Sequence, residues 1–170
     1  MSSKTARVTD EDPSTYTFSL RIKHPSVDPD EITQALGISP DHAWGCGEPR
    51  RSEGGLALGG TRRNSYWSAT LKLPSLRELV EEWIKVRDVP SPKAPTIKIP
   101  TMTLSMSSHL ALQLVRLRKH KALLERLTGE GGEVSLLIEM TAASGAVFTI
   151  EPTLARQMAE MGLRIEFQLE

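Results

Sequence analysis

The segment from Gly37 to Asn64 contains the residues whose types and spacing are best suited to chemistry. Seven such side chains lie there among several glycines: His42, Trp44, Cys46, Arg50, Arg51, Arg62 and Arg63. Guanidinium groups bind planar anions through paired hydrogen bonds, and an indole ring adds an aromatic surface. Connections longer than about 12 to 15 residues within a compact domain are usually functional or disordered. The segment therefore predicts a carboxylate or phosphate pocket, and the alternative is a flexible loop with solvated arginines.

The metal-binding and catalytic alternatives depend on His42 and Cys46, which could supply two metal ligands or a thiol beside a base. The other histidines, His24, His109 and His120, are not at ligand spacing from this pair. The chain also lacks the Gly-x-Ser-x-Gly motif of serine hydrolases. We therefore predict no catalytic residue, no metal and no cofactor, and we keep a small enzyme that acts on a charged metabolite through residues 37–64 as the alternative.

The composition is that of a folded, water-soluble domain. Of the 170 residues, 39% are hydrophobic and 25% are charged, and the 21 Lys and Arg residues equal the 21 Asp and Glu residues. A neutral chain lacks the positive field that drives non-specific binding to nucleic acid or anionic membranes. The single cysteine excludes an internal disulfide, and no apolar stretch approaches the roughly 20 residues that span a bilayer. We expect a cytoplasmic protein without a membrane partner, and a disordered leader over residues 1–14.

Five segments alternate between apolar and polar side chains, as strands buried on one face do. Their apolar positions are Tyr16, Phe18, Leu20 and Ile22; Trp67, Ala69, Leu71 and Leu73; Val134, Leu136, Ile138 and Met140; Ala146, Phe148 and Ile150; and Leu163, Ile165, Phe167 and Leu169. We expect residues 133–150 to form a hairpin that turns near Ser144 and Gly145. Ile97 and Ile99 could add a short edge strand.

Four helices are predicted between these strands from capping residues, apolar periodicity and stop signals. The first follows Asp28 and ends at Gly37, and the second begins at Ser75. The other two are expected over residues 108–127 and 152–161. Because each strand has one polar face, helices cannot cover both sides of the sheet.

The predicted fold class is therefore α+β, with a mostly antiparallel sheet of five or six strands and about four helices packed on one face. Residues 15–170 are expected to form a single domain, in which the proline-rich stretch 89–100 connects two halves. A duplicated ferredoxin-like unit is an alternative that stays open.

Two further surfaces could in principle contact nucleic acid. The helix over residues 108–127 is basic, but its charges surround an apolar stripe and are explained by solvation. The polar face of the sheet carries four charges of each sign and few aromatic rings, unlike an RNA-binding sheet. Nucleic acid is therefore not expected as a partner.

With these elements placed, the chain resembles an uncharacterised bacterial domain-of-unknown-function family, DUF 4279. The resemblance extends over nearly all of Tyr16 to Leu169. It is carried by the ordered set Phe18 to Ile22, Asp28 to Thr33, Leu36 to Pro40, Trp44 with Gly45 and Gly47, Tyr66 with Trp67, and Leu163 to Leu169. It implies a shared fold, and the family has no assigned activity to carry over.

The function predicted is a non-enzymatic binding module for a protein partner or a small anionic ligand. Its expected binding residues are Trp44, Arg50, Arg51, Arg62, Arg63 and Trp67. An immunity-like protein that blocks a toxin is a special case of this hypothesis. A dimerising role is a third possibility, in which Leu137 and its strand neighbours would form an exposed symmetric contact, and the oligomeric state is left open.

Overall fold

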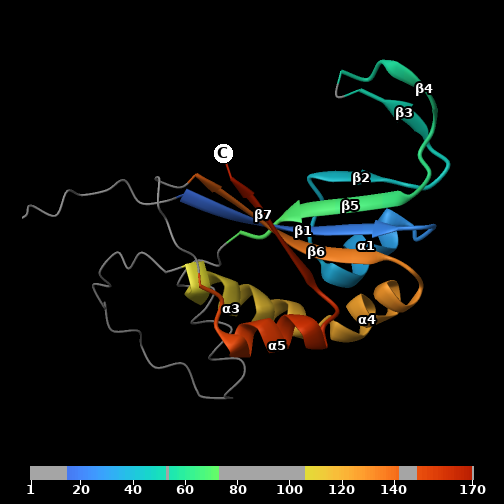
Figure 1. Ribbon diagram of the computed structural model, residues 1–170. Coiled ribbons are helices and arrows are strands. Elements are labelled where there is room, and N and C mark those ends of the chain that lie inside the picture. The colour runs from blue at the N-terminus through green and yellow to red at the C-terminus, as the bar shows by residue number, and fades with distance from the viewer. Residues whose placement is uncertain (1–14, 53, 73–105, 142–148, 170) are drawn as a thin grey trace, which may run out of the picture.

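The computed structural model describes residues 15–52, 54–72, 106–141 and 149–169, and the elements within them form a layered α+β arrangement (Figure 1). In chain order they are β1 (Thr15–His24), α1 (Pro29–Leu36), β2 (His42–Trp44), β3 (Pro49–Arg51), β4 (Ala57–Thr61), β5 (Ser65–Thr70), α3 (Met106–Arg118), α4 (Lys121–Gly129), β6 (Glu133–Thr141), α5 (Pro152–Glu160) and β7 (Arg164–Leu169). Five strands form one sheet in the order β2-β5-β1-β6-β7, and β3 and β4 form a separate two-stranded sheet. The predicted α+β class is confirmed.

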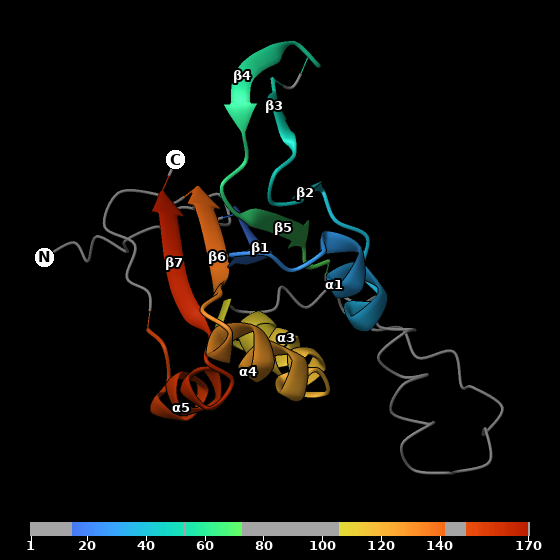
Figure 2. The same ribbon diagram turned by 90° about the vertical axis from the view of Figure 1, so that its right-hand side faces the viewer.

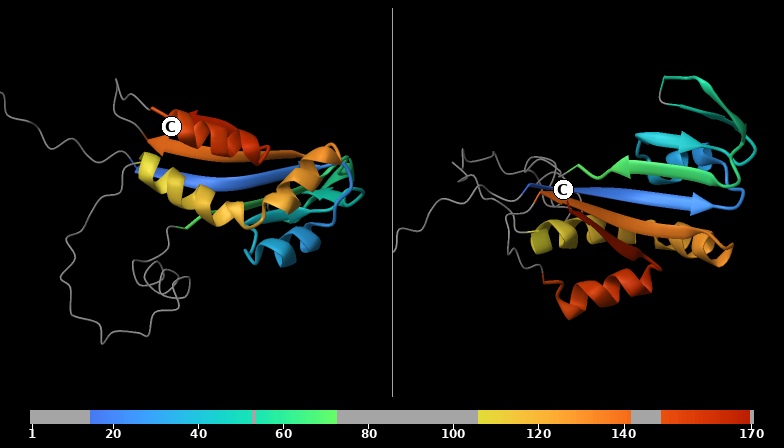
Figure 3. Two further views of the ribbon diagram at one scale, coloured as in Figure 1. Left: turned by 90° about the horizontal axis from the view of Figure 1, so that it is seen from below. Right: turned by 45° about the horizontal axis from the view of Figure 1, so that its top comes forward.

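The four described helices lie on one face of the five-stranded sheet (Figure 2, Figure 3). The alternation in the sequence explains this layering, because every second side chain of β1 and β6 points to the helices. The register of these two strands aligns Phe18 with Ile138 and Leu20 with Leu136. All four of these side chains are at most 1% exposed. The core therefore lies between the helices and the central strands.

The first helix begins and ends where the sequence predicts. The Asp28 side chain accepts a hydrogen bond from the backbone N–H of Asp30 at 2.9 Å, and Pro29 occupies the first turn. Gly37 adopts the left-handed conformation with φ of 66°, and its N–H donates to the Thr33 carbonyl. Ile32 and Leu36 then face the core.

The predicted helix over residues 108–127 is two helices in the structure, and this expectation is corrected. α3 ends at Arg118 and α4 begins at Lys121. The N–H of His120 donates to the Leu117 carbonyl at 2.9 Å, and the N–H of Leu124 donates to the His120 carbonyl at 3.1 Å. The sequence contains no glycine or proline at this break, so the usual stop signals are missing.

The sheet is mostly antiparallel, as predicted, but its last pair is parallel. β1 pairs with β5 and β6 in antiparallel fashion, β2 does the same with β5, and β6 and β7 run parallel on either side of α5 in the chain. Leu137 lies on the face of β6 turned away from the core, yet it is only 2% exposed. The expectation that Leu137 offers an exposed dimer contact is therefore wrong.

Several predictions fall on residues that the structure does not describe. The leader over 1–14, the helix from Ser75, the connection 89–100 with Ile97 and Ile99, and the turn at 144–145 lie outside the described residues. Thr149 and Ile150 are described and are not part of a strand. The single domain over 15–170 and the ferredoxin-like duplication stay predictions. Among the described residues, no helix has the length and apolar character needed to cross a membrane.

His109 is a buried, neutral histidine whose surroundings predict a pH-dependent stability. It is 4% exposed, and its ring centroid lies 4.5 Å from that of Phe18. The Gln113 amide nitrogen donates to the Leu71 carbonyl and lies 3.1 Å from His109 Nε2, so this ring nitrogen is the acceptor. Burial lowers the pKa of His109 below its ordinary value of 6.5.

The protein is therefore expected to lose stability as the pH falls below about 6.5, because the unfolded chain protonates His109 there while the folded chain resists protonation. Burial and Lys119 also lower the pKa of His120, which adds to the effect in the same direction. Urea unfolding at pH 8.0 and pH 5.5 measures the loss, and His109→Phe should reduce it. An equal loss in the variant would assign the pH dependence to other groups.

Candidate functional site

The strands β3 and β4 form a hairpin that projects from the sheet beside β2 and β5 (Figure 1, Figure 2). Two backbone hydrogen bonds join its ends: Arg62 N–H donates to the Glu48 carbonyl at 2.8 Å, and Gly47 N–H donates to the Arg62 carbonyl at 2.9 Å. The N–H of Cys46 also donates to Ser65 Oγ at 3.0 Å. The base of the hairpin is thus fixed to the start of β5, and Arg62 is fixed with it.

An aromatic pair stands on the open face of the sheet next to this base. Trp44 of β2 lies opposite Tyr66 of β5 in the strand register, and their rings stack with centroids 4.4 Å apart and an angle of 19°. The Arg62 Cζ atom lies 4.0 Å from the centroid of the Trp44 ring. Since Tyr66 covers one face of the indole, the guanidinium lies over the other. Each contact stabilises the arrangement by about 0.5 to 1.5 kcal/mol.

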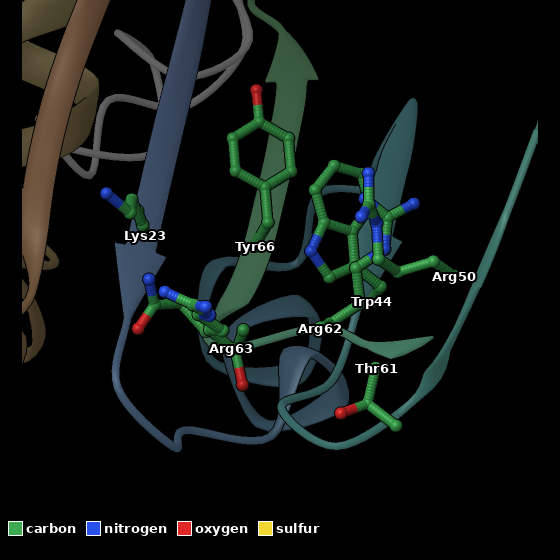
Figure 4. A pocket seen from close by; sticks show the side chains of 9 residues that line it. Lys23, Trp44, Arg50, Thr61, Arg62, Arg63 and Tyr66 are labelled. Carbon is green, nitrogen blue, oxygen red and sulfur yellow. The ribbon is translucent and has the colours of Figure 1, made fainter. Parts of the chain in front are cut away.

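These side chains line a cavity of about 380 Å³ between the open face of the sheet and the hairpin base (Figure 4). The lining residues are Lys23, Trp44, Arg50, Thr61, Arg62, Arg63, Asn64, Ser65 and Tyr66. They come from β1, β2, β3, β4, β5 and the segment between β4 and β5. This volume lies within the range of about 300 to 1,000 Å³ that is usual for small-molecule sites.

The cavity is positively charged. Four of its lining residues are cationic, Lys23, Arg50, Arg62 and Arg63, and none of the lining residues is an aspartate or glutamate. In the described part of the chain, none of these four cations forms an ion pair with a carboxylate; the arginine and lysine pairs there involve Arg21, Lys121, Arg126 and Arg164. Unpaired cations that converge on a cavity attract anions, and guanidinium groups bind carboxylate and phosphate in particular.

The structure brings together four of the six residues predicted for binding, Trp44, Arg50, Arg62 and Arg63, and places the other two elsewhere. Arg51 is exposed on β3 and does not line the cavity. Trp67 is 0% exposed, and its Nε1–H donates to Thr33 Oγ1 at 3.0 Å on the opposite face of the sheet. Adjacent strand residues point to opposite faces, so Tyr66, and not Trp67, lines the cavity.

Sequence reasoning did not assign Lys23 and Tyr66 to the site. Both lie in strands that were predicted, at positions on the polar face, and the register places Lys23 opposite Tyr66. Period-two alternation could have put them on the open face beside Trp44 if the pairing of the strands had been known. The pairing is a long-range property that no local signal gives.

His42 and Cys46 do not form a catalytic pair in the structure. Both are exposed, and neither lines the cavity. The Cys46 thiol donates to the Arg63 carbonyl at 3.3 Å, and no hydrogen bond links the two side chains in the described part of the chain. The described residues contain no cluster of three or more His, Cys, Asp or Glu side chains that could hold a metal ion.

Comparison with known families gives a match over the first half of the described fold. Residues 14–86 match a family described as a domain of unknown function (DUF4279). No curated protein and no solved structure gives a significant match. The matched range contains all nine residues that line the cavity, whereas the terminal Leu163 to Leu169 motif lies outside it. The resemblance inferred from the sequence is therefore supported over residues 14–86, which are similar to DUF4279, a family of unknown function.

Proposed function

We propose that the protein is a binding module that holds an anionic ligand in the cavity beside the Trp44–Tyr66 pair. The ligand presents carboxylate or phosphate oxygens, either on a small molecule or on an acidic segment of a partner protein. The observation that carries the proposal is the convergence of four cations with no carboxylate among the lining residues. The four cations repel one another in the free protein, so binding of an anion in the cavity lowers the electrostatic energy.

The arrangement of the arginines supports a ligand that is held from more than one side. Arg62 is oriented by its stacking on Trp44, and its backbone is fixed by hydrogen bonds to Glu48 and Gly47. Arg50 comes from the hairpin, while Lys23 comes from the centre of the sheet. Preorganised donors lose less side-chain entropy on binding than free ones, so Arg62 is the anchor.

The proposal predicts that inorganic pyrophosphate binds to the protein and that Arg62→Ala weakens this binding about tenfold or more. Isothermal titration calorimetry measures the dissociation constants of the wild type and of Arg62→Ala and Arg63→Ala. Arg51→Ala is the matched control, because it removes the same charge from the same hairpin outside the cavity. Binding should also weaken as the salt concentration rises.

A citrate titration and a titration with an acidic peptide distinguish the sources of the anion. A small-molecule site binds pyrophosphate or citrate more tightly than the peptide, and a partner-binding site has the reverse order. If Arg51→Ala and Arg62→Ala lost the same amount of affinity for pyrophosphate, binding would depend on the overall charge of the hairpin, which would contradict a site at the cavity.

A further inference from the structure

The strand β7 is the last strand at one end of the described five-stranded sheet. β7 pairs with β6 on one side, and no described strand follows it on the other (Figure 2). An edge strand presents unpaired N–H and C=O groups, and natural proteins protect such edges with charged side chains, lysine above all, with proline or with a bulge. The sequence of β7 is RIEFQL, which has no lysine or proline, and its register with β6 runs without a bulge.

The same strand carries apolar side chains that the helices do not cover. Ile165, Phe167 and Leu169 share the face of the sheet that packs on the helices, opposite buried side chains of β6. Phe167 is nevertheless 45% exposed and Leu169 is 68% exposed. The apolar layer of the core therefore continues onto β7 and ends in solvent, next to a backbone edge that no described strand covers.

The charges of β7 do not oppose the approach of another strand. Arg164 lies 3.5 Å from Glu133, and Glu166 lies 3.7 Å from Arg21, so both side chains are paired within the chain. The remaining polar side chain is the neutral Gln168. The edge thus has exposed apolar side chains, backbone groups that no described strand pairs with, and little net charge.

The alternation of β7 restricts how two such edges can pair. In an antiparallel pair of identical strands related by a two-fold axis, side chains of opposite residues lie on the same face of the sheet. If the axis passes through a residue, apolar residues lie opposite apolar residues. If it passes between two residues, apolar residues lie opposite polar ones. An axis at Glu166 places two like charges opposite each other, which is unfavourable. An axis at Phe167 places Phe167 opposite Phe167, Ile165 opposite Leu169, and Glu166 opposite Gln168, whose amide can donate to the carboxylate.

We propose that β7 pairs with β7 of a second copy of this chain, antiparallel and centred on Phe167. This pairing joins two five-stranded sheets into one continuous sheet. It fills the open edge with backbone hydrogen bonds and covers the exposed Phe167 and Leu169 side chains. It is independent of the anion site, which lies near the opposite edge of the sheet, at β2 and β5.

Cysteine cross-linking tests the register. In a Cys46→Ser background, Phe167→Cys is expected to form a disulfide-linked dimer under mild oxidation, because opposite Cα atoms in an antiparallel pair lie about 4.5 to 5.5 Å apart. Leu169→Cys is the control, since its two copies are offset by four residues, about 13 Å along the strands. Cross-linking of Leu169→Cys as fast as that of Phe167→Cys would overturn the register.

Analytical ultracentrifugation tests the pairing without a cysteine. The 170-residue chain is expected to sediment as a dimer at high concentration, and Phe167→Lys is expected to sediment as a monomer. Val115→Lys should remain dimeric, because Val115 is 67% exposed on α3, away from the edge. Circular dichroism spectra check that each variant is folded. A wild-type chain that is monomeric over the whole dilution series overturns the proposal, as does equal dissociation of both lysine variants.

Discussion

Replacement of Trp67 by alanine is expected to lower the free energy of unfolding by about 4 kcal/mol. The indole is fully buried in β5, and its Nε1–H donates to Thr33 Oγ1 at 3.0 Å. Thr33 Oγ1 in turn donates to the Pro29 carbonyl, so the indole also connects α1 to the sheet. Alanine removes this connection and leaves a large cavity that the surrounding strands can fill only in part. Urea unfolding followed by circular dichroism measures the change.

The variant Thr33→Val separates the hydrogen bond from the packing. It keeps the indole in place and removes its acceptor, so it should cost about 1 kcal/mol. Trp67→Phe, which retains most of the volume, should fall between the two. If Trp67→Ala cost no more than Thr33→Val, the indole would contribute little packing energy, and its assignment to the core would be wrong.

Replacement of Gly132 by alanine is expected to cost about 3 kcal/mol, the second largest effect. A Cβ at this position would lie 2.6 Å from the Leu127 carbonyl oxygen and 2.7 Å from His24 Cδ2. Neither group can move freely. The Leu127 carbonyl accepts the Gly132 N–H at 2.9 Å, and His24 Nδ1 accepts from the Val27 N–H at 2.9 Å. The added methyl group must therefore displace the end of α4 or the His24 ring.

Gly129→Ala is the matched control for this prediction. It makes the same chemical change three residues earlier, at the last position of α4, where a Cβ meets no atom within 4 Å. Its free energy of unfolding should change by no more than about 0.5 kcal/mol. Comparable losses in the two variants would attribute the effect to glycine conformational freedom and not to the close approach.

Much of the fold follows from local signals in the sequence. Period-two alternation identified β1, β5, β6 and β7, because successive side chains of a strand point to opposite faces of the sheet and the apolar ones share the helix-covered face. Capping residues at Asp28 and Gly37 gave both ends of α1. The break between α3 and α4 could not be predicted, since the residues between the two helices include no glycine or proline that would signal a stop.

The candidate site was predicted only in part, for a physical reason. Its arginines were recognisable from residue type, because guanidinium groups in a long connection are suited to anions. Strand pairing decides which of two adjacent aromatic residues faces the cavity, and it favours Tyr66 over Trp67. Lys23 joins the site because β1 lies next to β5, although 20 residues lie between Lys23 and Trp44 in the sequence.

The central claim, an anion site at the Trp44–Tyr66 pair, is tested most directly by a nuclear magnetic resonance titration with inorganic pyrophosphate. The Trp44 indole N–H and the Arg62 Nε–H signals report on the cavity, and the buried Trp67 indole N–H is an internal reference. We predict saturable shifts of the Trp44 and Arg62 signals with no shift of the Trp67 signal. In Arg62→Ala, the shift of the Trp44 signal should be lost. Unchanged Trp44 and Arg62 signals, with shifts elsewhere or nowhere, would contradict the claim.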